Sequence, residues 1–179
     1  CYDESKRYGE TLCVNFAQQY NLPITIARPF NNYGPGLKIN DQRVIPDISK
    51  NIFQNKDIIL FSNGSPTRTF CYVADAIIGY FKILLNGKIG DSYNIGIEEP
   101  EVSIKELAIK MSLIANNLFD YSGQIKFKDN ADTNYLKDNP NRRCPSIKKA
   151  RSEIGFNPEI DLDEGLKRCL IWYKENNSL

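Results

Sequence analysis

The 179-residue sequence contains no histidine. This absence excludes Ser-His-Asp and Cys-His nucleophile systems and every metal site that would use an imidazole ligand. Any acid-base chemistry must therefore use tyrosine, lysine or carboxylate side chains. Cysteine is sparse as well, with five widely scattered residues and no close pair that would predict a zinc site or a redox couple. We expect no bound metal, and thiols that are reduced and mostly buried.

The sequence also has almost no net charge, because 23 basic residues against 22 acidic ones give +1 at pH 7. Such a chain has no global field to attract nucleic acid or an anionic membrane. Long apolar runs are missing too, since Gly79 and Lys82 interrupt the stretch at 76–85, which is too short for a bilayer. An initiating methionine and a secretory leader are absent. We therefore expect a truncated chain from a soluble, cytoplasmic protein that binds neither nucleic acid nor membrane.

The composition is otherwise that of an ordinary globular protein, with 41% hydrophobic and 25% charged residues. Apolar residues at three-to-four spacing predict helices, the first of which ends before Pro23, and Ser103 with Glu106 predicts a capping box. Asn63-Gly64 predicts a tight hairpin turn into the segment 68–70. The predicted helices are 4–20, 44–53, 75–85, 103–118, 147–154 and 163–174, the predicted strands are 24–27, 57–61, 93–96 and 124–128, and 129–145 is a predicted polar loop.

This alternation of helices and strands predicts an α/β fold with a parallel sheet. No repeat or flexible linker divides the chain, so one compact unit is expected. Only two or three short core strands are predicted, however, which is few for a parallel sheet. We expect part of that sheet to lie outside this sequence.

Tyr2 and Lys6 are the first candidates for chemistry, because a four-residue spacing places both on one face of a helix. A tyrosine base near neutral pH needs its pKa lowered by about 3 units, or about 4 kcal/mol. A neighbouring ammonium group favours the charged phenolate. Of the ten tyrosines only Tyr2 has a lysine four residues later. Taken alone, the spacing describes an unrelated surface tyrosine and lysine better than an active pair.

Four ordered motifs add to this pair. Tyr2-Asp3-Glu4-Ser5-Lys6 looks like Y-x-x-x-K, and the segment 28–36 is similar to R-x-F-N-x-Y-G-P. Residues 65–75 look like G-S-x-T-R-x-F-x-Y-V-x-D, and 93–96 match Y-N-I-G. The sequence thus resembles the extended short-chain dehydrogenase/reductase family, the nucleotide-sugar epimerases and dehydratases, over the carboxyl-terminal half of those proteins.

The resemblance implies the carboxyl-terminal part of a Rossmann-type doubly wound domain plus a small mixed α/β substrate-binding lobe. Residues 1–35 would be the last helix and strand of the Rossmann domain. Residues 36–179 would form the substrate lobe, apart from a helix and strand at about 73–96 that return to the Rossmann sheet. The family also implies a homo-oligomer.

The resemblance further implies NAD as cofactor and a UDP- or dTDP-sugar as substrate. Tyr2 would take the proton of the sugar C4 hydroxyl, while Lys6 would lower the tyrosine pKa and hold the nicotinamide ribose. The resulting 4-keto sugar would then lead to an epimer, a 4-keto-6-deoxy sugar or a decarboxylated product. These three outcomes stay open.

Further site residues follow from the same motifs. Pro29 and Phe30 would lie near the nicotinamide, although a buried core position explains Phe30 equally well. Asn31 would contact the sugar nucleotide, and its alternative role is turn formation. Three arginines would bind the nucleotide end, with Arg68 as the diphosphate clamp, and each could instead be a solvated surface charge. In descending order they are Arg68, Arg143 and Arg43.

The sequence departs from the family in three places. Gly36 stands where UDP-glucuronate decarboxylases typically have arginine, which weakens the case for decarboxylation, and Ser146 stands where an aspartate is common. A phosphate-cradling G-x-x-G-x-x-G is missing. We therefore expect this chain alone to be inactive. The alternative is a non-catalytic remnant that binds a nucleotide sugar or only self-associates.

Overall fold

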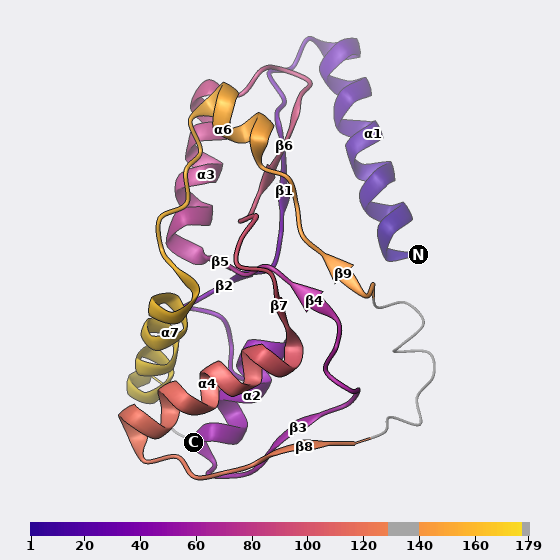
Figure 1. The fold of residues 1–179 in the computed structure, drawn as a ribbon. Helices are drawn as coiled ribbons and strands as arrows, with labels where there is room; N and C mark the ends of the chain where they lie inside the picture. Colours follow the sequence, from indigo (N-terminus) through magenta and orange to yellow (C-terminus); the bar gives the residue numbers. More distant parts are fainter. Residues whose placement is uncertain (129–139, 177–179) are drawn as a thin grey trace.

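The computed structural model describes residues 1–128 and 140–176, and every structural statement below refers to these residues. Helices and strands alternate along the chain, as predicted (Figure 1). The helices are α1 (Tyr2–Tyr20), α2 (Val44–Phe53), α3 (Val73–Asn86), α4 (Ile104–Phe119), α6 (Lys148–Ile154) and α7 (Leu162–Asn176). The strands are β1 (Ile26–Pro29), β2 (Asn32–Tyr33), β3 (Ile58–Leu60), β4 (Thr67–Arg68), β5 (Cys71–Tyr72), β6 (Ser92–Ile95), β7 (Val102–Ser103), β8 (Ile125–Phe127) and β9 (Arg142–Arg143).

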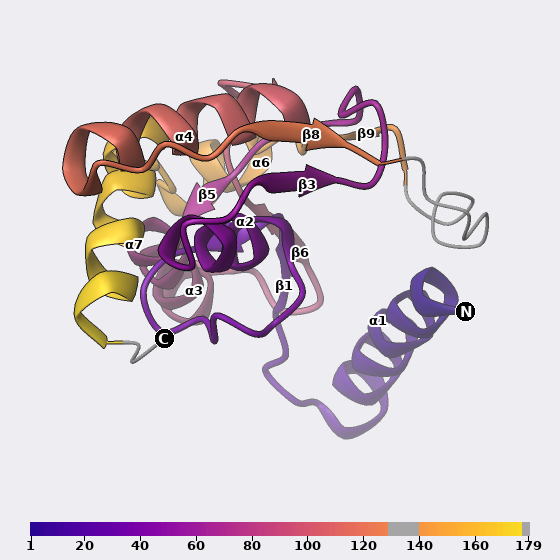
Figure 2. The same cartoon turned by 90° about the horizontal axis from the view of Figure 1, so that it is seen from below.

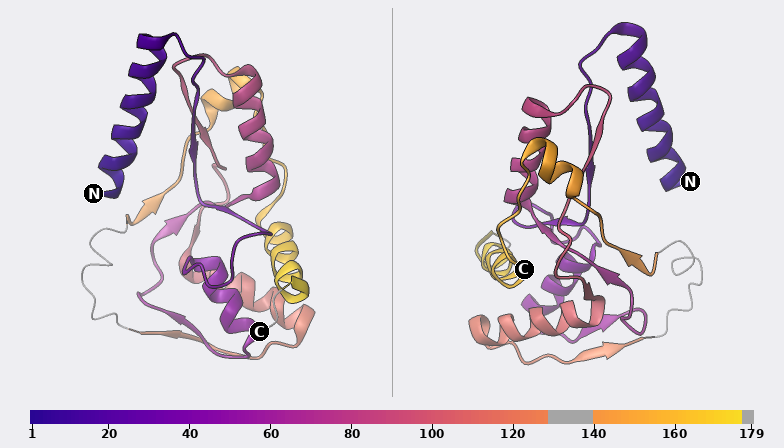
Figure 3. Two further views of the ribbon diagram at one scale, coloured as in Figure 1. Left: turned by 180° about the vertical axis from the view of Figure 1, so that it is seen from behind. Right: turned by 45° about the horizontal axis from the view of Figure 1, so that its top comes forward.

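Strands β1 and β6 form a parallel pair at one end of the molecule, with Ile26 opposite Ser92 and Pro29 opposite Ile95. Helix α3 covers one side of this pair, and α1 stands on the other side (Figures 1 and 3). A hydrophobic core fills the space between β6, α3 and α6. Its buried members are Cys71, Ala76, Ile83, Tyr93, Ile95, Ile97, Ile147, Ala150, Ile154 and Phe156.

A second, larger core lies at the other end, where α2, α4 and α7 pack against one another and α2 packs against β3 of the parallel pair β3–β8 (Figure 2). The apolar spacing of α2 buries Ile45, Ile48 and Ile52 on one face. Helix α4 begins with the predicted capping box, in which the Ser103 hydroxyl accepts from the Glu106 amide and the Glu106 carboxylate accepts from the Ser103 amide. The local sequence signals for these helices are therefore confirmed.

The predicted hairpin at Asn63-Gly64 is wrong. Strand β3 pairs with β8, and β4 pairs antiparallel with β7 and parallel with β9. Gly64 does turn the chain, with φ +74°, but it turns beneath the start of α4, where the Lys105 amide donates to the Gly64 carbonyl at 3.0 Å. An added Cβ at Gly64 would lie 2.9 Å from the Lys105 Cβ. The glycine thus permits a close approach to a helix.

The strand limits also differ from the sequence prediction, most of all for β1, and one strand lies inside a predicted loop. Strand β1 covers Ile26–Pro29 instead of 24–27, because the ladder begins where the Ile26 amide donates to the Asp91 carbonyl at 2.9 Å. The short strand β9 lies inside the predicted loop 129–145, of which residues 129–139 are outside the described part. In the described part of the chain, no helix is long and apolar enough to cross a membrane.

The expectation that most thiols are buried is wrong, because two of the five cysteines are buried and the other three are partly or fully exposed. These differences in exposure predict the reactivity of the thiols. Cys71 and Cys169 are buried, and burial raises the pKa of each thiol to about 12. Both are therefore protonated at neutral pH, whereas reaction needs the thiolate. Cys1 is exposed. In a thiol-labelling time course at pH 8, read by peptide mass spectrometry, we expect Cys1 to react first and Cys71 and Cys169 only on unfolding; rapid labelling of either buried thiol in the folded chain would contradict this.

Candidate functional site

The predicted catalytic pair lies in the first half of α1. The Lys6 ammonium is 5.3 Å from the centre of the Tyr2 ring, as expected for neighbours one helical turn apart. Tyr2 is 64% exposed and Lys6 is also exposed. The phenol and the ammonium group are therefore both accessible to a ligand.

Strand β1 leads from α1 into the segment predicted to lie beside the nicotinamide. Pro29 is exposed at the end of the strand. Phe30 is half-buried, and its amide donates to the Ile95 carbonyl at 2.9 Å. An added Cβ at Gly96 would lie 3.0 Å from the Phe30 Cβ, so the two backbones approach closely here. Phe30 is thus half-buried beside Gly96 and belongs to neither hydrophobic core, while Pro29 offers an exposed surface.

Asn31 has the left-handed conformation, with φ +45°, which asparagine adopts more readily than most residues. Its side-chain amide donates to the Thr69 carbonyl at 2.9 Å, and its own carbonyl accepts from the Cys71 amide at 3.3 Å. The turn-forming alternative is therefore observed for Asn31. The same contacts bring this residue to the strand that carries Arg68.

Arg68 and Arg143 come together in the three-stranded sheet β7-β4-β9. The two residues are opposite each other in the parallel register of β4 and β9, so their side chains start from the same face of the sheet. Directly opposed like charges are unfavourable unless a group of opposite charge or acceptors lie between them. The Thr69 amide donates to the Arg143 carbonyl at 3.3 Å, which links this pair to Asn31. The structure thus groups three of the predicted substrate residues.

Burial distinguishes the two arginines. Arg68 is 7% exposed, and its guanidinium donates to the carbonyls of Thr67 and Pro140 at 2.7 and 2.6 Å. Arg143 is exposed on β9. These two backbone contacts fix the orientation of the Arg68 guanidinium. The pair therefore combines a fixed cation with an accessible one.

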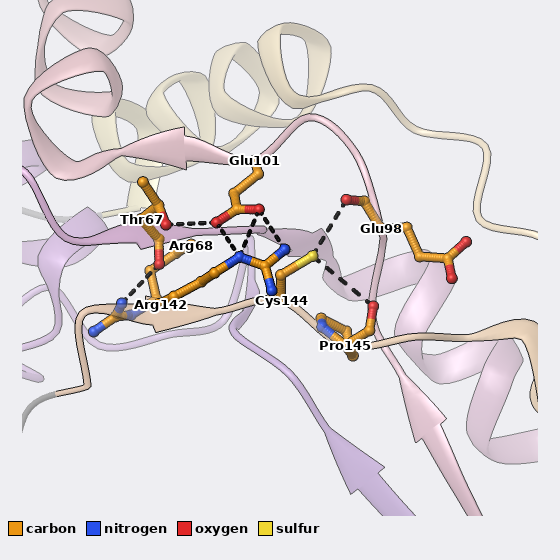
Figure 4. A network of polar contacts seen from close by, with 7 residues as sticks. All are labelled: Thr67, Arg68, Glu98, Glu101, Arg142, Cys144 and Pro145. Carbon is orange, nitrogen blue, oxygen red and sulfur yellow. Dashed lines mark hydrogen bonds and ion pairs between the residues drawn. The ribbon is translucent and has the colours of Figure 1, made fainter.

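A network that the sequence analysis missed holds β9 against this sheet (Figure 4). The Arg142 guanidinium donates to both Glu101 oxygens, with Nε–Oε1 2.9 Å and Nη2–Oε2 2.7 Å, and the Thr67 hydroxyl donates to Oε1 at 2.5 Å. Hydrogen bonds from Arg142 and Thr67 hold the pKa of Glu101 below its usual range. The doubled arginine at 142–143 was the available signal, but its partner is distant in sequence.

A shallow cavity of about 650 Å³ lies beside this network and does not coincide with the arginine pair. Its lining is mostly acidic, which is unfavourable for a diphosphate. The lining residues are Glu98, Glu99, Pro100, Glu101 and Arg142. We therefore place the candidate anion site at β4 and β9 and not in this cavity.

Arg43 lies elsewhere, directly before α2, with its Nε 2.7 Å from the Asp41 carboxylate. It is exposed and is not part of the β4–β9 pair. The first turn of α1 is the end of that helix nearer to β9, and the other end leads to β1 (Figures 1 and 3). The end of α1 at which the predicted catalytic pair lies is thus the end nearer to β9 (Figures 1 and 3).

Comparison with known proteins agrees with these motifs. The sequence model of the NAD dependent epimerase/dehydratase family matches residues 1–96. UDP-glucuronic acid decarboxylase 3 of Arabidopsis thaliana is 36% identical over 166 residues, which are 93% of this chain and 45% of that protein. The chain therefore spans less than half the length of this relative.

Solved structures of epimerases also match this chain over about half of their own length. An epimerase from Methanothermobacter thermautotrophicus is 29% identical with a TM-score of 0.81, over 94% of this chain and 48% of that one. The UDP-glucuronic acid 4-epimerase of Bacillus cereus, in complex with UDP-glucuronic acid and NAD, is 26% identical with a TM-score of 0.81, over 97% and 52%. The chain thus has the fold of about half of each of these proteins.

Proposed function

The chain belongs to the NAD dependent epimerase/dehydratase family, and we propose that it provides the tyrosine-lysine pair and the substrate lobe of an enzyme that modifies a nucleotide-diphosphate sugar through a 4-keto intermediate. The observation that carries the proposal is the in-register pair Arg68 and Arg143, joined through Thr69 to Asn31. In this proposal residues 1–35 and about 73–96 belong to the Rossmann domain. The core that α3 and β6 share supports their grouping, and it also includes α6, which the proposal assigns to the substrate lobe.

The chemistry assigned to α1 is proton transfer. The Tyr2 phenolate takes the proton from the sugar C4 hydroxyl, and the Lys6 ammonium stabilises the phenolate. NAD supplies a hydride acceptor when bound, so that loss of a proton from oxygen and a hydride from carbon leaves a ketone at C4. Tyr2 and Lys6 would hold the nicotinamide ribose, with Pro29 and Phe30 beside the ring.

The residues present fit only one end of that cofactor. The exposed phenol and ammonium of α1 suit the ribose and nicotinamide. In Rossmann folds the pyrophosphate of the dinucleotide binds at a glycine-rich loop and a helix amino terminus, and the sequence has no G-x-x-G-x-x-G. We propose that the 179 residues by themselves do not turn over substrate.

The proposed substrate contacts are made mainly by arginine side chains. Arg68 and Arg143 would bind the diphosphate, Asn31 would lie at the sugar side, and Arg43 would have at most a peripheral role at the nucleotide. The relatives support a UDP-sugar ahead of a dTDP-sugar, because the Arabidopsis and Bacillus proteins both carry UDP-glucuronic acid in their names.

Exposed apolar side chains on α3 support self-association of the chain. They are Ile77, Ile78, Phe81, Leu84 and Leu85.

Calorimetric titration of this chain with UDP-glucuronic acid tests the anion site. Charge-assisted hydrogen bonds contribute about 1.5–3 kcal/mol, so Arg143→Met is expected to weaken binding about tenfold or more. Arg68→Met should have at least the same effect. Arg168→Met is the matched control, because Arg168 is exposed on α7 and bonded to Glu164 within the same helix.

Circular dichroism of each variant shows whether the fold is intact, which matters most for the buried Arg68. Equal loss of affinity in Arg168→Met, or full affinity in a folded Arg143→Met, would contradict the assignment of the arginine pair. Absence of heat with every UDP- and dTDP-sugar would favour the alternative, a non-catalytic remnant. Product formation by the chain alone would contradict its proposed inactivity.

A further inference from the structure

Glu10 lies on the same helix face as the proposed catalytic pair. Tyr2, Lys6 and Glu10 are spaced four residues apart along α1 and form one stripe. Across from this stripe, Arg28 on β1 directly precedes the segment Pro29–Asn31 that carries the proposed nicotinamide and sugar contacts. Neither Glu10 nor Arg28 has a role in the proton transfer described above.

The two side chains form a two-pronged ion pair between helix and strand. Arg28 Nε donates to Glu10 Oε1 at 2.7 Å, and Arg28 Nη2 donates to Oε2 at 2.5 Å. The hydrogen bond from Arg28 holds the pKa of Glu10 below its usual range, so the carboxylate is ionised at neutral pH. Both side chains are partly exposed, and the free energy of such a pair is small. Its planar, bidentate geometry nevertheless fixes an orientation.

Few other contacts of the described residues fix the direction of α1. Ala17 is its one buried residue, and the helix ends at Asn21 in the left-handed conformation. At 1.5 Å per residue, Tyr2 lies about 28 Å along the helix from Asn21. A rotation of α1 by about 10° about its Asn21 end would therefore move Tyr2 by about 5 Å. A misplacement of a catalytic group by about 1 Å can lower the reaction rate about 100-fold. A second attachment near the middle of α1 limits this rotation.

We propose that Glu10 and Arg28 are a positioning pair that holds the Tyr2-Lys6 face of α1 in register with the Pro29–Asn31 segment. The structural part of the proposal, that the ion pair fixes the direction of α1, concerns only this chain. The catalytic part, that this direction is needed for turnover, rests on the proposed function. The two parts need separate measurements, so that failure of one can be told from failure of the other.

The single tryptophan and the exposed Cys1 allow the structural test in the 179-residue chain. Trp172 on α7 serves as donor, and an acceptor dye on Cys1 reports the end of α1. Cys13→Ser and Cys144→Ser remove the other partly exposed thiols. Time-resolved energy transfer is expected to give a broader Trp172–Cys1 distance distribution in Glu10→Gln and in Arg28→Gln than in the parent.

Glu164→Gln is the matched control, because it breaks a glutamate–arginine pair within one helix and should leave the distribution unchanged. The double exchange Glu10→Arg with Arg28→Glu is expected to narrow the distribution again. If Glu10→Gln and Arg28→Gln both keep the parental distribution, the positioning role is overturned. None of these measurements depends on catalysis.

The catalytic part is tested in the full-length enzyme. Glu10→Gln is expected to lower kcat by about tenfold or more with the UDP-sugar KM within about twofold, because the proposed diphosphate contacts of Arg68 and Arg143 lie on β4 and β9. The double exchange should recover part of the lost kcat. Unchanged kcat in Glu10→Gln, or an equal loss in Glu164→Gln, would overturn the catalytic part. Retained turnover in Tyr2→Phe would instead overturn the proposed function and leave the energy-transfer result standing.

Discussion

Replacement of Tyr2 by phenylalanine is expected to lower the kcat of the full-length enzyme by about 10²–10⁴-fold, the usual contribution of a positioned acid-base group. The substitution removes only the phenolic oxygen and keeps the ring above which the Lys6 ammonium lies at 5.3 Å. Affinity for the nucleotide sugar should stay close to that of the parent, because the proposed diphosphate contacts belong to Arg68 and Arg143. The measurement is steady-state product formation together with calorimetric binding.

Tyr8→Phe is the matched control for this prediction. Tyr8 lies on the same helix and is also 64% exposed, but Leu12 and not a lysine lies four residues further. Its kcat should therefore remain within about twofold of the parent. A Tyr2→Phe enzyme that keeps most of its turnover would remove Tyr2 from the mechanism, and an equal loss in Tyr8→Phe would show that any change on this helix impairs the enzyme.

Replacement of Phe156 by alanine is expected to lower the free energy of unfolding by about 3–5 kcal/mol, as for other fully buried phenylalanines. Phe156 is 1% exposed in the core between β6, α3 and α6. Its ring packs so closely on α3 that an added Cβ at Gly79 would lie 2.9 Å from its Cε2. The truncated side chain leaves a cavity that this rigid contact cannot close easily.

Urea titration followed by both far-ultraviolet circular dichroism and Trp172 fluorescence measures this effect. Trp172 packs against the other core, so coincident transitions would show that the two cores unfold together. Phe81→Ala is the control, because Phe81 on α3 is 59% exposed and its loss should change stability by at most about 0.5 kcal/mol. A loss below about 1 kcal/mol for Phe156→Ala would contradict the packing described here.

The helices were the most predictable part of the fold. Their signals are local: Ile45, Ile48 and Ile52 repeat at helical spacing in α2, and Ser103 with Glu106 caps α4. Strand pairing was less predictable, because short strands offer little periodicity. The Asn63-Gly64 pair suggested a hairpin by local turn chemistry, but partners from β7 and β9 occupy both edges of β4 instead.

The candidate site likewise had a part that was predictable from local sequence and a part that was not. The motif residues Tyr2, Lys6, Asn31 and Arg68 were recognisable in sequence, and their proposed roles await the experiments above. The partners in the ion pairs Glu10–Arg28 and Glu101–Arg142 could not be identified from the sequence. A glutamate and an arginine far apart in the chain form a pair only when the fold brings their elements together.

The sequence by itself therefore determined the family and the approximate positions of the helices, because each depends on residue identity or on spacing within a short segment. Only the tertiary structure decided that Arg68 stands opposite Arg143, that Arg43 lies apart from them, and that Arg28 holds α1 through Glu10. These relations depend on strand register and on helix direction. Both are fixed by packing between distant segments, which no local pattern records.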